Sequence, residues 1–182
     1  IIKQDASFSY RVLRSANSAA FGLRQTVRSI QEALLLIGQD RVRKWASIWA
    51  MAGLNDGATP ELVNITILRA RCCELLGQTR RQSAEGSDHF LLGLCSLLDV
   101  ILGQPMDVAL ENLPLSTETR AALLGGDNPE RHILDAVTAY ERGAWDAAAQ
   151  AATRGGLDGD RLPEAYAGAL KWVWSLARGE AA

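Results

Sequence analysis

Two histidines, His89 and His132, are the side chains of this 182-residue sequence best suited to holding a metal ion. A metal-dependent hydrolase site needs several His, Asp or Glu side chains that converge on one or two cations. Asp88 precedes His89, but both fall at the start of a predicted helix, where an aspartate is better explained as a cap. His132 follows Pro129, which starts another predicted helix. We therefore assign surface or capping roles to both histidines and expect no metal.

The three cysteines lack the sequence context of a nucleophile or a metal ligand. Cys72, Cys73 and Cys95 have no CxxC spacing and fall in apolar helical patterns, without a nearby base. Such thiols are typical of inert, reduced packing residues in a cytoplasmic protein. Glycine pairs at 125–126 and 155–156 indicate helix ends and not phosphate loops. The sequence therefore predicts no catalytic nucleophile and no cofactor.

Asp99 is the acidic residue that most needs an explanation. It falls within HFLLGLCSLLDVILG, a segment that is hydrophobic all round and is predicted to be one central helix starting at Ser87 or Asp88. A buried carboxylate needs a partner or a function. We expect a structural hydrogen bond, with an arginine of the N-terminal half as the candidate partner. Gly93 in the same helix would allow a neighbouring helix to approach closely.

The net charge of -2 conceals two oppositely charged halves. Residues 1–82 hold 12 Lys and Arg against 6 Asp and Glu, whereas residues 83–182 hold 7 against 15. This asymmetry indicates either two faces that meet or a basic face for an anionic partner, although solvated helix surfaces are the stronger explanation. Nucleic-acid binding is disfavoured, because the sequence has a pI of about 5.7 and no aromatic stacking array.

Apolar residues recur at helical spacing almost throughout, which predicts an all-α bundle in a single domain. Pro60 is expected to begin a long helix; its predicted inner face is Leu62, Ile65, Leu68, Cys72 and Leu75, and its predicted outer face includes Arg69, Arg71 and Glu74. Later helices are predicted from Met106 to Asn112, between Ser116 and Gly125, from Pro129 to Tyr140, from Trp145 to Thr153 and over 162–178. In the last of these, the residues that should face inward are Tyr166, Leu170, Val173, Trp174 and Ala177. No apolar run is long enough to cross a membrane. Because the first residue is Ile, we expect the chain to be a fragment of a longer protein.

Residues 9–52 have the one residue order that looks like a signature: SYRVLRSANSAAFGLRQTVRSIQEALLLIGQDRVRKWASIWAMA. The pieces SYRVLR (9–14), NSAAFG (17–22) and ALLLIG (33–38) resemble the HDOD domain, an HD-related output domain of bacterial signalling proteins. The later pieces RARCCEL (69–75), GLCSLLD (93–99) and AYERG (139–143) resemble its branch fused behind EAL domains, which are cyclic di-GMP phosphodiesterase modules. The resemblance implies an HD-like orthogonal bundle over 1–112, a helical extension over 113–182 packed on it, and an EAL-type domain missing upstream.

The same resemblance argues against catalysis. True HD hydrolases carry an adjacent His-Asp pair on the central helix, and the matching positions here are Ser96 and Leu97. The upstream helix that would supply another histidine has the segment 69–74 instead. Asp99, one turn away, cannot restore the ligand set alone. We therefore expect no enzyme activity in this chain.

The leading hypothesis is a non-catalytic regulatory module of cyclic di-GMP signalling that acts by protein contact. Its partner would be the upstream EAL-type domain, a second copy in a homodimer, or another signalling protein. The residues predicted to form the contact surface are Arg14, Asn17, Ser18 and Arg24, although Asn17 and Ser18 are equally suited to capping and turning the chain. The alternative is a degenerate HD-type phosphohydrolase acting on a nucleotide. The sequence identifies neither the signal nor the oligomeric state.

Overall fold

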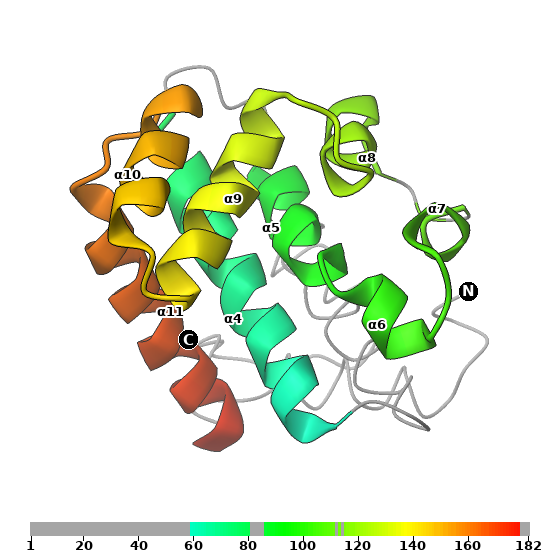
Figure 1. The fold of residues 1–182 in the computed structure, drawn as a ribbon. Coiled ribbons are helices and arrows are strands. Elements are labelled where there is room, and N and C mark those ends of the chain that lie inside the picture. Colours follow the sequence, from blue (N-terminus) through cyan, green and yellow to red (C-terminus); the bar gives the residue numbers. More distant parts are fainter. Residues whose placement is uncertain (1–58, 81–85, 112, 114, 179–182) are drawn as a thin grey trace, which may run out of the picture. The chain divides into compact units, whose positions relative to one another are not determined.

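The computed structural model describes residues 59–80, 86–111, 113 and 115–178 (Figure 1). Within these ranges the chain forms eight helices and no strand, which confirms the predicted all-α class. Residues 56–171 make one compact unit, and residues 172–182 belong to a second unit with residues 1–55. The fold below is that of the first unit. Predictions for residues 1–58, including the contact surface at Arg14, Asn17, Ser18 and Arg24, lie outside the described residues.

Helix α4 (Pro60–Gly77) begins as the sequence predicts. Pro60 occupies its first turn, and the Thr59 hydroxyl accepts a hydrogen bond from the Leu62 N–H. Its predicted faces are correct for Cys72, which is buried, but wrong for Ile65, which is 41 % exposed, and for Arg69 and Glu74, which are buried. Both charges are tolerated inside because each has an ion-pair partner: Glu141 for Arg69, and Arg71 for Glu74.

The predicted single central helix is two helices, α5 (Gly86–Cys95) and α6 (Leu98–Leu102). The break falls at Ser96 and Leu97. The Ser96 hydroxyl donates to the Gly93 carbonyl at 2.7 Å, and the Ser96 N–H donates to the same oxygen at 3.3 Å. Serine hydroxyls compete with the regular helix ladder in this way, which accounts for the interruption. Helix α6 ends at Gly103, whose φ of 62° is the left-handed conformation that favours glycine.

The remaining helices lie close to their predicted positions. They are α7 (Met106–Ala109), α8 (Thr117–Leu123), α9 (Pro129–Glu141), α10 (Trp145–Arg154) and α11 (Arg161–Arg178). Side-chain caps set two of the starts: Ser116 accepts from the Thr119 N–H, and Asn128 accepts from the Arg131 N–H. These local signals explain why the sequence locates the helices well.

Helix α4 packs along α5 and is crossed by α9, which in turn pairs with α10 (Figure 1). Gly93 lies where α5 approaches α4: a Cβ there would lie 2.5 Å from the Ala70 backbone. The close approach predicted for Gly93 is therefore confirmed. On α11 the predicted inner face is wrong, because Leu162, Ala165 and Ala169 are buried whereas Leu170 is exposed. None of the described helices has the length and apolar content to cross a membrane.

Candidate functional site

Three side chains, from α4, from α9 and from the turn after α5, meet around Ser96, one of the two positions that the sequence resemblance is expected to match to the His-Asp pair. Arg69 of α4 donates from Nε and Nη2 to the Glu141 carboxylate, with an Nη2–Oε2 distance of 2.6 Å. Its Nη1 donates to the Ser96 hydroxyl at 2.9 Å. The side chains of Arg69 and Glu141 are 10 % and 14 % exposed. We call this group of Arg69, Ser96 and Glu141 the Arg69 clasp.

The helices position each member of the clasp. Gly93 lets α5 approach the backbone of α4, so that Ser96 at the end of α5 comes within reach of Arg69. The bond from Ser96 to the Gly93 carbonyl fixes its hydroxyl proton, which leaves an oxygen lone pair for the arginine. Glu141 is the last residue of α9 and closes the clasp from the other side. The clasp therefore ties α4, α5 and α9 together.

The clasp is poorly suited to metal chemistry. A guanidinium has no acceptor atom, so Arg69 cannot serve as a ligand to a cation. The Glu141 carboxylate already accepts hydrogen bonds from Arg69 in a bidentate pair, the planar geometry in which arginine recognises a carboxylate. Within the described part of the chain, no group of three His, Cys, Asp or Glu side chains is arranged to hold a metal ion. The geometry of the clasp suits a structural link between α4, α5 and α9.

The two other residues named at this site lie beside the clasp. Leu97 precedes α6 and is half-buried, and Asp99 lies in the first turn of α6. Asp99 is half-buried, so the expected burial is wrong. Among the described residues its side chain has neither a hydrogen bond nor an ion pair, and Arg69, one of the arginines of the N-terminal half, bonds Ser96 and Glu141. The break between α5 and α6 places Asp99 at a helix start, where an acidic side chain suits the helix dipole.

The two histidines lie apart, and one of them is not a surface residue. His132 is held by Asp127, with Nε2 2.7 Å from Oδ1, just before the start of α9. His89 is buried between α4 and α5, which contradicts the predicted surface or capping role. A Cβ at Gly77 would lie 2.4 Å from its ring, so the glycine makes room for the imidazole. Its Nε2 lies 3.9 Å from Oε1 of Glu130.

The cysteines are free and buried, as the sequence predicts. Burial raises the pKa of the Cys72 thiol to about 12, with a further contribution from the negative charge of Glu141. Burial likewise raises the pKa of Cys95 to about 12 and that of Cys73 well above its ordinary value. Because the thiolate is the reactive form, these side chains are poor nucleophiles.

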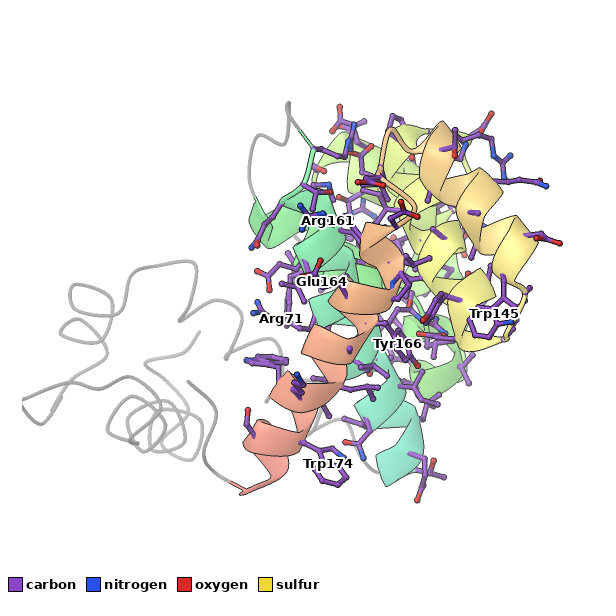
Figure 2. All side chains as sticks on the ribbon, turned by 90° about the vertical axis from the view of Figure 1, so that its left-hand side faces the viewer. Arg71, Trp145, Arg161, Glu164, Tyr166 and Trp174 are labelled. Atoms are coloured by element: carbon purple, nitrogen blue, oxygen red, sulfur yellow. The ribbon has the colours of Figure 1, made fainter. Side chains whose placement is uncertain are left out.

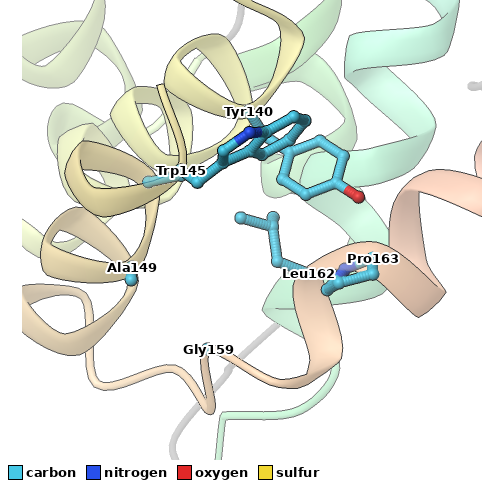
Figure 3. Close-up of a pocket in the computed structure, with 7 residues that line it drawn as sticks. Tyr140, Trp145, Ala149, Gly159, Leu162 and Pro163 are labelled. Carbon is cyan, nitrogen blue, oxygen red and sulfur yellow. The ribbon is translucent and has the colours of Figure 1, made fainter. Parts of the chain in front are cut away.

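A second candidate site, which the sequence reasoning missed, is an open groove between α9, α10 and α11. Its volume is about 390 Å³, and its lining, which we call the aromatic groove, is Tyr140, Trp145, Ala148, Ala149, Gly159, Leu162 and Pro163 (Figure 3). Trp145 is 61 % exposed and lies at the surface of α10 (Figure 2). The one sequence signal for this site was a tryptophan at the start of a helix whose other apolar residues are alanines.

The chain resembles known proteins over almost all of its length. A family model described as HDOD domain matches residues 1–104. An uncharacterized protein of Bacillus subtilis, YuxH, is 31% identical over 178 residues, which covers 96% of this chain and 43% of the relative. A protein of Vibrio cholerae named cyclic di-GMP phosphodiesterase CdgJ is 26% identical over 178 residues, covering 98% of this chain and 41% of the relative. The chain thus spans about two fifths of the length of these curated relatives. No solved structure matches it.

Proposed function

The chain belongs to the HDOD domain family, and from that premise we propose that it is a non-catalytic regulatory module of cyclic di-GMP signalling. It would act in the cytoplasm, by protein contact, on an EAL-type domain in the same protein. The cyclic di-GMP context is supported by the name of the Vibrio cholerae relative. Since the match covers 41% of that relative, the activity in its name can reside in the remainder.

The Arg69 clasp is the observation that carries the non-catalytic part of the proposal. The resemblance aligns Ser96 and Leu97 with the His-Asp pair of HD hydrolases. In this chain Ser96 accepts a hydrogen bond from a cation, and that cation is paired with Glu141. A guanidinium has no acceptor atom, and it engages the oxygen atoms of Ser96 and Glu141 that could otherwise face a metal ion; it stabilises the fold only while these partners remain.

A hydrolysis assay separates this proposal from the phosphohydrolase alternative. The purified 182-residue chain is incubated with cyclic di-GMP, or with common nucleotides, in the presence of Mg²⁺ or Mn²⁺. We expect no turnover and no stoichiometric metal. Turnover that Ser96→Ala or Asp99→Ala abolishes would establish the alternative.

A second experiment tests the regulatory part of the proposal. The predicted contact surface is removed in the full-length protein by the double variant Arg14→Ala/Asn17→Ala. We expect a change in the phosphodiesterase activity of the upstream domain, with the variant still folded by circular dichroism. Unchanged activity and unchanged partner binding would show that this surface is not the contact site.

A further inference from the structure

The aromatic groove is an apolar recess with walls from three helices. Tyr140 and Trp145 form one wall, and Leu162 and Pro163 of α11 face them (Figure 3). Ala148 and Ala149 lie between, and their small side chains leave the recess open. At about 390 Å³ the volume lies in the lower part of the range of ligand pockets, which suits one large side chain and its neighbours better than a nucleotide.

Contacts within the chain hold the aromatic wall of the groove in place. The Trp145 ring meets the Tyr140 ring edge to face, with centroids 4.9 Å apart and an interplanar angle of 72°. Tyr140 in turn contacts Tyr166, with centroids 5.1 Å apart. Ala148 and Leu162 are almost fully buried, so the floor belongs to the core. An exposed tryptophan that packs against a second ring beside a recess is the kind of residue that dominates binding energy at interfaces.

Three exposed aspartates lie next in sequence to residues that line the groove. Asp146 follows Trp145, and Asp158 and Asp160 flank Gly159, which lines the groove. These three residues are exposed, and among the described residues none of their carboxylates has an ion-pair partner. The nearest arginine on α11, Arg161, is paired with Glu164. Two further exposed arginines, Arg142 in the turn before α10 and Arg154 in its last turn, have no ion pair among the described residues, so the three aspartates outnumber them.

From the apolar recess and these carboxylates we propose that the aromatic groove docks a basic segment of a partner protein through one large apolar anchor residue. The anchor fills the space between Trp145 and Leu162, and lysines or arginines beside it face Asp146, Asp158 and Asp160. The charges would speed association and exclude acidic segments, while the anchor supplies the affinity. This goes beyond the proposed function, because it rests on helices outside the HDOD match to residues 1–104.

The test uses short fluorescein-labelled peptides and the full 182-residue chain. One set has lysine and arginine flanks and a central Leu, Phe or Trp; a second has the same flanks and a central Ser; a third has acidic flanks and the apolar centres. Fluorescence anisotropy measures binding at low and high salt. We expect at least one basic peptide with an apolar centre to bind in the micromolar range, and to bind at least tenfold more weakly with a central Ser.

Variants assign the binding to the groove. Trp145→Ala should weaken it at least tenfold, Trp145→Phe should retain most of it, and Asp158→Asn/Asp160→Asn should weaken it severalfold at low salt. Leu124→Ala, which removes an equally exposed apolar side chain elsewhere, should leave it unchanged. Circular dichroism establishes that each variant is folded.

Several results would overturn the proposal. These are an absence of binding by every basic peptide to the folded chain, binding that is unaffected by Trp145→Ala, or equal binding of the acidic set. A chain that dimerises in solution and becomes monomeric on Trp145→Ala would instead identify a second copy as the occupant. Because none of these readouts involves hydrolysis or the upstream domain, failure here is distinguishable from failure of the proposed function.

Discussion

Two neighbouring residues at the end of α9 belong to regions of opposite character. Glu141 turns into the Arg69 clasp, where its charge is neutralised inside the fold. Tyr140 lines the aromatic groove, where apolar surface stays open to solvent. The clasp uses charged chemistry for structure, and the groove leaves hydrophobic surface available for recognition. The comparison indicates that charged residues are not necessarily functional residues. Whether a side chain serves the fold or recognition depends on its burial and on its partners.

The largest expected effect comes from breaking the clasp on one side. Glu141→Leu leaves the Arg69 guanidinium buried without its carboxylate, which should lower the free energy of unfolding by about 3–5 kcal/mol. Urea denaturation measures the change. The control is Glu164→Gln in the exposed Arg161–Glu164 pair, which should cost less than about 1 kcal/mol.

A double variant sharpens the same comparison. Arg69→Met/Glu141→Leu removes both charges, so it should recover much of the stability that Glu141→Leu loses. If the single variant were as stable as the native chain, the clasp would have no structural role.

The next effect tests the close helix approach that places Ser96. Gly93→Ala puts a methyl group 2.5 Å from the Ala70 backbone, so α4 and α5 must separate. We expect a loss of about 1–3 kcal/mol in the free energy of unfolding, as for other overpacked cores. Gly159→Ala is the matched control, because nothing lies within 4 Å of its Cβ. Equal effects at the two glycines would contradict the packing described here.

A smaller loss in the free energy of unfolding should appear at alkaline pH, through the buried thiol of Cys72. The folded chain raises the pKa of Cys72 from 9.0 to about 12, so the unfolded chain releases this proton first as pH rises. The stability that this thiol contributes is therefore complete below pH 9 and is lost between pH 9 and 12. At pH 10 the loss should be about 1 kcal/mol. Denaturation of the native chain and of Cys72→Ala at pH 8 and pH 10 isolates it; parallel losses would refute the assignment.

The smallest effect on stability is expected in the groove. Trp145 is largely exposed, so Trp145→Ala should change the free energy of unfolding by about 1 kcal/mol or less, chiefly through its contact with Tyr140. Thermal denaturation checks this. A loss as large as that of Glu141→Leu would mean that the tryptophan supports the fold and that its exposure is not a sign of recognition.

The helices were predictable because their signals are local. Thr59 and Pro60, Ser116, and Asn128 with Pro129 each set a helix start within four residues of the cap. The break between α5 and α6 could not be predicted, because an all-apolar segment has no periodic pattern of polar residues that would show where a helix ends. The break depends on one hydroxyl, that of Ser96, which bonds the Gly93 carbonyl.

Burial on α4 could not be inferred from the sequence in the same way. Arg69 was assigned to the outside because its partner Glu141 lies 72 residues away, and no local pattern connects the two. The groove required three helices to meet, and the sequence indicated only an isolated tryptophan. The resemblance predicts that Ser96 and Leu97 stand at substituted positions, but the contacts of Ser96 with Arg69, and of Arg69 with Glu141, are visible only in the structure.

The most direct test of the account is cyclic di-GMP hydrolysis by the 182-residue chain alone, with Mn²⁺ or Mg²⁺ present and the bound metal quantified in the same sample. The account predicts no turnover and no stoichiometric metal, because Ser96 and Leu97 are the residues expected at the positions of the His-Asp pair, and the Ser96 hydroxyl accepts a hydrogen bond from Arg69. Turnover with bound metal that disappears in Ser96→Ala or Asp99→Ala would contradict it.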